Sequence, residues 1–247
     1  MAADGGGDAW ADVTAVILAG GVGSRLRSVV SDRPKGLAEV CGRPFLAFLL
    51  DQLADAGARS VFISTGHLAD QVEAAFGPSW RGMSIAYSRE AAPLGTGGGL
   101  RLAFNRIPTA TMLVMNGDSY CGVDLTAVVV DHITHGRVPT LVLSRQADTS
   151  RFGRVERDAD DRITAFREKA EAGGPGWINA GIYALDRALV AELPADRPVS
   201  LEREAFPAWI AHGLRGFPCE GAFLDIGTPE SYAAAADCFA RLPRTAL

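Results

Sequence analysis

Two basic residues and two aspartates stand in segments that suit them to hold a polyphosphate and a metal ion. Arg25 lies two residues after Gly23, and Lys35 directly follows Pro34. An arginine can give a phosphate two parallel hydrogen bonds, and a lysine gives it a point charge. Asp118 follows an apolar run, and Asp225 lies in Phe-Leu-Asp-Ile-Gly-Thr-Pro. Two carboxylates with phosphate oxygens are ligands that Mg²⁺ prefers. The four residues predict metal-assisted phosphate chemistry, although each aspartate also suits a simple turn.

Arg25 belongs to a glycine-rich loop that comes directly after a predicted buried strand, and Lys35 lies a few residues further on, after Pro34. The loop reads Ala-Gly-Gly-Val-Gly-Ser-Arg-Leu-Arg over 19–27. Glycines let the backbone turn sharply and present bare amide groups to an anion. Leu26 stands where a dinucleotide-binding fingerprint needs its third glycine, and the chain has no Gly-Lys pair of a P-loop. We therefore expect a phosphate-binding loop of another kind, with an ordinary tight turn as the alternative.

Strand-like and helix-like segments alternate through the first part of the chain. Short apolar runs predict strands over 13–18, 60–64, 85–88, 111–115 and 140–144, and helical spacing predicts helices over 45–56, 68–76, 98–105 and 124–135. This rhythm indicates crossover units and a mainly parallel sheet. Ligands of such sheets bind beyond the carboxyl ends of the strands. The loops after Leu18, Ser88 and Met115 should therefore line one crevice.

The rhythm changes near residue 151. We predict a hairpin over 153–156 and 162–166, a strand over 177–185, and helices over 201–212 and 229–240. The first 12 residues are acidic and glycine-rich, which predicts a disordered lead-in. Residues 13–247 are expected to form a single domain, with a first half of about 13–150 and a second half of about 151–240.

Composition excludes several functional classes. The formal net charge of −5 and the pI of about 5.4 argue against a nucleic-acid partner bound through an overall basic face. The four cysteines form no CxxC pair, so we expect reduced thiols. His132 and His135 are expected on a helix surface. The chain has no apolar run of membrane-spanning length and no signal-peptide pattern, so we predict a cytoplasmic protein without a membrane partner.

Together the motifs resemble the sugar-1-phosphate nucleotidyltransferases. The resemblance rests on Ala-Gly-Gly-x-Gly-Ser-Arg-Leu with Pro-Lys, on Pro-Leu-Gly-Thr-Gly-Gly over 93–98, on Asn-Gly-Asp over 116–118 and on Asp-Ile-Gly-Thr-Pro over 225–229. It implies a three-layer Rossmann-like fold, a mixed and mainly parallel sheet flanked by helices. It further implies Arg25, Lys35 and Asp118 as catalytic residues, and a Mg²⁺ cofactor on Asp118 and Asp225.

The resemblance also implies two substrate subsites. Nucleotide-binding residues would be Leu18, Ala19, Gly20, Gly21, Gly23, Ser24, Arg25, Lys35, Glu90, Gly95, Thr96, Asn116 and Gly117. Sugar-phosphate-binding residues would be Glu168, Lys169, Asn179, Gly181 and Glu202. Ser200 also suits a helix N-cap, which is an ordinary structural reason for the segment around Glu202.

The implied reaction joins a nucleoside triphosphate to a sugar 1-phosphate and releases pyrophosphate. The chain looks most like the D-glycero-α-D-manno-heptose 1-phosphate guanylyltransferases, which implies GTP. The alternatives are mannose or glucose 1-phosphate with GTP, UTP, dTTP or CTP; a non-catalytic nucleotide-sugar-binding regulator; and a dinucleotide-dependent oxidoreductase. A homo-oligomer is compatible with the sequence, which does not determine the oligomeric state.

Overall fold

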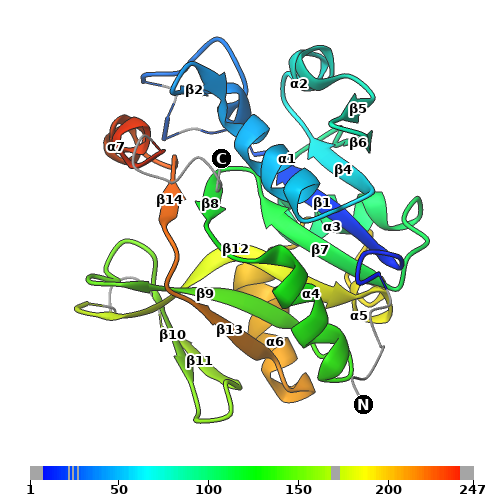
Figure 1. Ribbon diagram of the computed structural model, residues 1–247, viewed down its shortest axis with the longest axis vertical. Coiled ribbons are helices and arrows are strands. Elements are labelled where there is room, and N and C mark those ends of the chain that lie inside the picture. The colour runs from blue at the N-terminus through cyan, green and yellow to red at the C-terminus, as the bar shows by residue number, and fades with distance from the viewer. Residues whose placement is uncertain (1–7, 22, 24, 27, 168–172, 240–247) are drawn as a thin grey trace, which may run out of the picture.

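A mixed β-sheet runs through the molecule and carries helices on both faces (Figure 1). The structure is a computed structural model that describes residues 8–21, 23, 25–26, 28–167 and 173–239. The helices are α1 (Phe45–Asp55), α2 (Ala69–Phe76), α3 (Gly95–Phe104), α4 (Leu125–Thr134), α5 (Arg187–Ala191), α6 (Phe206–Trp209) and α7 (Pro229–Phe239), with short helical turns η1 (Lys35–Leu37), η3 (Leu201–Ala205) and η4 (Ile210–His212).

All eight predicted strands are present among the described residues, together with six that the sequence analysis did not predict. They are β1 (Val13–Ala19), β2 (Glu39–Val40), β3 (Arg43–Pro44), β4 (Ser60–Thr65), β5 (Ser79–Trp80), β6 (Met83–Arg89), β7 (Thr111–Asn116), β8 (Ser119–Cys121), β9 (Thr140–Gln146), β10 (Arg154–Arg157), β11 (Ile163–Arg167), β12 (Gly176–Asp186), β13 (Arg215–Cys219) and β14 (Phe223–Asp225). Within the described residues ten of them form the main sheet, and β14 pairs with β8 beside it.

The centre of the main sheet is parallel. β1 is parallel to β4 and β7, and β4 is parallel to β6, as crossover connections require. β12 then adds antiparallel to β7, and β9 antiparallel to β12. The carboxyl ends of β1, β6 and β7 therefore meet at one edge, where the predicted crevice should lie.

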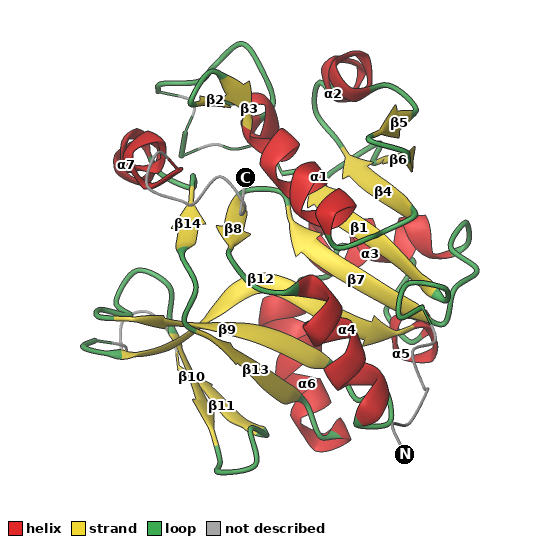
Figure 2. Ribbon diagram, viewed as in Figure 1, coloured by secondary structure: helices red, strands yellow, loops and turns green. Residues whose placement is uncertain are grey.

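Side chains of β1 alternate between two hydrophobic cores, one on each face of the sheet. Ala15 and Ile17 pack into the core that α1, α4 and α7 cover. Val16 packs into the core that α3, α5 and α6 cover. Figure 2 shows the two groups of helices with the strands between them. This arrangement confirms the predicted three-layer Rossmann-like fold.

Two expectations about individual segments are wrong. The lead-in was expected to be disordered through residue 12, yet Trp10 is 3% exposed, and its indole Nε1–H donates to Thr126 Oγ1 at 3.1 Å. An aromatic ring that packs against a core orders the backbone around it. His132 was expected on a helix surface and is instead fully buried in α4, with Nδ1 2.8 Å from Val138 O; burial lowers its pKa.

The helix α3 begins at Gly95, three residues earlier than predicted, although glycine weakens helices. The glycines are needed because other groups lie against them. A β-carbon on Gly97 would come within 2.9 Å of Val199 Cγ1, and one on Gly98 within 2.7 Å of Leu94 Cβ. Close packing therefore overrides helix propensity here.

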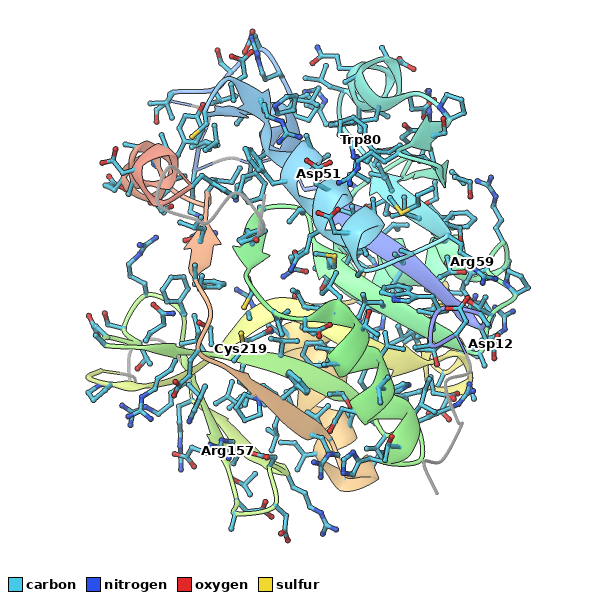
Figure 3. All side chains as sticks on the ribbon, in the orientation of Figure 1. Asp12, Asp51, Arg59, Trp80, Arg157 and Cys219 are labelled. Atoms are coloured by element: carbon cyan, nitrogen blue, oxygen red, sulfur yellow. The ribbon has the colours of Figure 1, made fainter. Side chains whose placement is uncertain are left out.

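The polar contacts at the far side of the sheet are structural. Trp80 Nε1–H donates to Asp51 Oδ1 at 2.9 Å, and the two side chains point toward one another between α1 and β5 (Figure 3).

Cys41, Cys121 and Cys219 are free thiols, as expected. Among the helices of the described ranges, none combines the length and apolar character that crossing a bilayer requires.

Candidate active site

A cavity of about 420 Å³ opens where β1, β6 and β7 end. Its lining includes most of the predicted nucleotide-site residues: Leu18, Ala19, Gly20, Gly21, Gly23, Arg25, Lys35, Glu90, Gly95, Thr96, Asn116, Gly117 and Asp118. Glu202, which was expected on the sugar, lines the same cavity. The predicted crevice is thus formed by segments far apart in the chain.

A second cavity of about 350 Å³ adjoins the first, because Arg25, Asn116 and Asp118 line both. It adds three further predicted residues, Asn179, Gly181 and Asp225. Ser24, Glu168 and Lys169 lie outside the described residues. Every other residue predicted for the site lines one of the two cavities, which makes them neighbouring lobes of one site.

The glycine loop is anchored by an apolar side chain. Leu26 is 1% exposed, and its N–H donates to Gly23 O at 2.9 Å. Gly23 has a φ of +57°, a left-handed conformation that glycine adopts without strain. Leu26, which stands where a dinucleotide-binding fingerprint needs a glycine, therefore packs into the core and holds the loop in place. Arg25 remains exposed at the cavity.

Lys35 and Asp118 form an ion pair within the site. Lys35 Nζ donates to Asp118 Oδ2 at 2.7 Å, and the lysine side chain is 13% exposed while the aspartate is 46% exposed. Lys35 begins the turn η1 directly after Pro34, whose fixed φ stiffens the loop. The cation and the carboxylate expected to act on a triphosphate therefore already lie together.

The second aspartate reaches the site through strand pairing. β14 is antiparallel to β8 with Asp225 opposite Ser119, and Ile226 N–H donates to Asp118 O at 3.0 Å. The Gly227 N–H donates to the Asp225 carboxylate. Asp118 and Asp225 thus lie on hydrogen-bonded neighbouring segments rather than on opposite sides of the molecule.

Arg151 is a site residue that sequence reasoning missed. Its Nη2 lies 3.1 Å from Asp225 Oδ2, and it lines the second cavity. The guanidinium stacks over the Phe152 ring at 5.1 Å, and that ring packs edge-on against Phe223 at 5.5 Å. The sequence signal was slight, since an arginine before a predicted hairpin is common, and only the β14 pairing reveals its partner.

Glu90 brings a half-buried carboxylate to the end of the first cavity. Leu94 N–H donates to its Oε2 at 2.9 Å, and Ser64 Oγ donates to its Oε1 at 3.3 Å. Burial raises the pKa of Glu90, and these two hydrogen bonds oppose the shift. A β-carbon on Gly99 would come within 2.7 Å of Glu90 Oε1, so the adjacent glycine leaves room for the carboxylate.

Tyr183 is the second residue that sequence reasoning missed. Its hydroxyl oxygen accepts hydrogen bonds from Asn179 Nδ2 at 3.0 Å and from Asn116 Nδ2 at 3.2 Å.

Ser200 acts as the N-cap of η3, as anticipated, by accepting from Arg203 N–H at 3.2 Å. It also donates to Glu202 Oε2 at 2.9 Å, so the structural and the functional interpretation of this segment are compatible.

Comparison with known proteins agrees with this geometry. The sequence profile of the family described as Nucleotidyl transferase matches residues 14–241. The mannose-1-phosphate guanylyltransferase of Mycobacterium tuberculosis is 39% identical over 224 residues, which cover 89% of this chain and 62% of that protein. The D-glycero-α-D-manno-heptose 1-phosphate guanylyltransferase of Aneurinibacillus thermoaerophilus is 36% identical, covering 88% of this chain and 94% of that protein.

A solved structure shares the fold as well. HddC from Yersinia pseudotuberculosis, complexed with GMP-PN, superposes with a TM-score of 0.80 at 30% identity, covering 92% of this chain and 99% of that chain. The present chain spans only about three fifths of the mycobacterial relative but nearly all of the heptose enzyme. On the match over residues 14–241 and these likenesses, the chain belongs to the nucleotidyl transferase family.

Proposed function

We propose that this chain is a Mg²⁺-dependent guanylyltransferase that joins GTP to a sugar 1-phosphate and releases pyrophosphate. The single observation that carries the proposal is the convergence of the glycine loop, the Lys35–Asp118 pair and the Arg151–Asp225 pair on two adjoining cavities. Two cations and two carboxylates at the meeting point of two lobes suit a reaction between two anionic substrates.

The reaction needs alignment and charge neutralisation rather than a protein base. A phosphate oxygen of the sugar 1-phosphate attacks the α-phosphorus of GTP and forms a new P–O bond. The bond from the α-phosphorus to the bridging oxygen breaks, and its electron pair leaves with pyrophosphate. The nucleophile is already an anion, so Arg25 and Lys35 contribute by binding the phosphates and stabilising charge in the transition state.

The carboxylates fit a magnesium ion. Asp118 and Asp225 supply hard oxygen donors on adjacent segments, and Mg²⁺ is usually bound by one or two carboxylates together with substrate phosphate oxygens. Among the described residues no group of three or more histidine, cysteine or acidic side chains gathers for a metal, so phosphate oxygens and water would complete the coordination. Bound there, the ion would neutralise the triphosphate.

Glu90 favours guanine among the bases. The Watson–Crick edge of guanine presents two adjacent N–H donors, and an ionised carboxylate offers two acceptor oxygens. Uracil and thymine present one donor flanked by carbonyl oxygens, which a carboxylate repels. The position of Glu90 at the first cavity, half-buried and held by Leu94 N–H and Ser64, therefore supports GTP. The guanylyltransferase names of the relatives support the same base.

For the sugar we propose D-glycero-α-D-manno-heptose 1-phosphate first and mannose 1-phosphate second, because the names of the relatives divide between these two. Both sugars share the manno configuration, so the region where the two cavities meet, between Glu202 of the first and Asn179 of the second, would read that feature in either case. Asn179 and Gly181 line the second cavity and are our candidates for sugar contacts. We propose the same role for Glu168 and Lys169, and we include Ser24 with the nucleotide loop.

A panel of triphosphates and sugar 1-phosphates, scored by pyrophosphate release with and without Mg²⁺, tests the proposal. We expect GTP to exceed UTP, dTTP and CTP, and one of the two manno sugars to exceed glucose 1-phosphate. Equal rates with GTP and UTP would remove the guanylyl assignment. Tight GTP binding without turnover on any sugar would instead favour a non-catalytic nucleotide-sugar-binding regulator.

A further inference from the structure

The Tyr183 hydroxyl lies at the centre of a polar network that joins the two cavities. Tyr183 is fully buried in β12. The hydroxyl oxygen accepts from Asn116 Nδ2 at 3.2 Å and from Asn179 Nδ2 at 3.0 Å, and the hydroxyl donates to Glu202 Oε1 at 3.5 Å. These contacts use the one donor and the two acceptor sites that a hydroxyl possesses.

The network determines which atom each amide presents. A carboxylate only accepts hydrogen bonds, so the hydroxyl proton is committed to Glu202, and both asparagines must turn their nitrogens toward Tyr183. Asn179 Oδ1 then accepts from Gly181 N–H at 2.8 Å. Asn116 Oδ1 is buried, and within the described part of the chain it has no hydrogen-bond partner. Burial raises the pKa of Tyr183 well above its ordinary value, which keeps the hydroxyl able to donate.

Glu202 has one committed oxygen and one with spare capacity. Its Oε2 accepts from Thr96 Oγ1 at 2.7 Å and from Ser200 Oγ at 2.9 Å. Its Oε1 accepts the longer bond from Tyr183 and retains a second lone pair. Since Glu202 lines the first cavity, Glu202 Oε1 is an acceptor available to a ligand, whereas Asn116 Oδ1 is buried and Asn116 serves to fix the Tyr183 hydroxyl.

A β-bulge holds this arrangement in place. The register of β12 against β9 shifts between Asn179 and Tyr183, and Gly181 within the shift has a φ of +78°. Bulges re-aim side chains next to active sites. A β-carbon on Gly181 would come within 3.1 Å of Asn116 Nδ2, so the bulge brings β12 close against the end of β7.

We propose that Tyr183 is a positioning residue for sugar recognition, whose hydroxyl aims Glu202 Oε1 at a hydroxyl group of the sugar. The inference rests on the proposed function and deepens it by assigning an atom that reads the sugar. A carboxylate attracts hydroxyl donors and repels phosphate oxygens. The phosphates of both substrates therefore lie toward Arg25, Lys35 and Arg151, and the sugar ring lies toward Tyr183.

Steady-state kinetics of Tyr183→Phe test the inference, because phenylalanine keeps the ring and removes only the hydroxyl. We expect the KM for mannose 1-phosphate to rise about tenfold while the KM for GTP changes less than about twofold, the scale of one lost hydrogen bond. Tyr87→Phe is the matched control: Tyr87 donates to Gly77 O at 2.6 Å and lines neither cavity. It should change neither KM.

Monodeoxy analogues of mannose 1-phosphate give a measurement that would not change in Tyr183→Phe if Tyr183 had only a structural role. With the native chain, at least one analogue should lose about tenfold in kcat/KM, and this loss should shrink to about twofold in Tyr183→Phe. A loss that stays undiminished, or KM values for GTP and sugar that rise together, would overturn the inference.

A second variant keeps the inference testable if Tyr183→Phe folds poorly. Glu202→Ala removes one acceptor outright, and the penalty for the same monodeoxy analogue should vanish; a penalty that persists rejects the assignment of Glu202 to a sugar hydroxyl. The proposed function and the role of Tyr183 can be rejected separately. A native chain that binds GTP but releases no pyrophosphate with any sugar contradicts the proposed function, whereas an active native chain with unaltered variants contradicts this inference alone.

Discussion

Lys35 Nζ donates to Asp118 Oδ2 at 2.7 Å, so two groups separated by 83 positions in the chain neutralise one another in the free protein. A metal ion on Asp118 would compete with the lysine for that carboxylate. The displaced ammonium would then be available to a phosphate oxygen nearby. Substrate and metal binding would thus rearrange an existing ion pair rather than require new charges to be buried.

Asp118→Asn should abolish turnover while leaving the fold intact. We expect kcat for pyrophosphate release to fall by about a thousandfold or more, because a metal-assisted step loses a charged ligand. The thermal midpoint should fall by no more than about 4 °C, since a half-exposed ion pair contributes little stability. Asp55→Asn is the control, as Asp55 pairs with Arg81 at 2.8 Å with similar exposure, 48%. Activity of Asp118→Asn within tenfold of native would remove this residue from the metal site.

Arg151→Met should weaken the sugar phosphate selectively. In the free chain Arg151 is paired with Asp225 at 3.1 Å, and metal binding to that carboxylate would release the guanidinium. We expect the KM for sugar 1-phosphate to rise about ten- to a hundredfold, with the Mg²⁺ concentration for half-maximal activity unchanged or lower. Initial rates over a matrix of sugar 1-phosphate, GTP and Mg²⁺ concentrations give the KM for each substrate and the Mg²⁺ concentration for half-maximal activity.

The control for Arg151 is Arg59→Met, at the start of β4 and so at the sheet edge opposite the site (Figure 3). It should leave every kinetic constant unaltered. If Arg151→Met raises the KM for GTP and not for the sugar, the guanidinium belongs to the triphosphate, and the division of the two cavities proposed above is incorrect.

The fold was predictable because its elements are apolar and periodic. The strands at β1, β4, β7 and β9 and the helices α1 and α4 begin and end within about two residues of their predicted limits, since a buried strand and a half-buried helix leave different apolar spacings. The positions of the glycine loop and of Asp118 at the carboxyl edge of the sheet were also predictable, because each closely follows a buried strand. The position of Asp225 was not, because it depends on the pairing of β14 with β8.

What escaped prediction depends on which strands become neighbours. Tyr183 reaches Asn116 only because β12 adds antiparallel to β7 with a bulge, and Arg151 meets Asp225 only because β14 pairs with β8. Neither pairing leaves a local periodic signal. Trp10 was missed for a related reason, because one aromatic residue in a polar segment does not reveal the core that will cover it.

Glu90→Gln should reduce discrimination between GTP and UTP. The amide replaces one acceptor oxygen by a donor, which mismatches guanine N–H groups, so we expect the ratio of kcat/KM values to fall about ten- to a hundredfold. The pH dependence follows from the raised pKa of Glu90. As pH falls through that raised pKa, protonation removes the acceptor pair, and discrimination by the native chain should decline at a higher pH than for an exposed glutamate.

The ratio of GTP to UTP rates cancels titration of the triphosphates themselves, which both nucleotides share. In Glu90→Gln this ratio should be low and independent of pH. A native ratio that does not decline as the pH is lowered, or a variant that keeps full discrimination, would place base selection on other groups of the cavity.

Gly181→Ala should cost both stability and activity, for two separable reasons. Gly181 has a φ of +78°, which disfavours alanine by about 1 kcal/mol, and a new β-carbon would also come within 2.5 Å of Ser119 Oγ and 3.1 Å of Asn116 Cβ. Gly82 has a φ of +87°, and no heavy atom of the described residues lies within 4 Å of the place that a β-carbon would take there, so Gly82→Ala isolates the backbone contribution. Urea unfolding should show Gly82→Ala losing about 1 kcal/mol and Gly181→Ala losing about 1–3 kcal/mol more. Because the β-carbon would meet both Ser119 of β8 and Asn116 of β7, Gly181→Ala should also raise the KM for the sugar phosphate, whereas Gly82→Ala should not. Equal losses in both variants would mean that β7 and β8 yield to the added methyl group and that the bulge does not hold Asn116 in place.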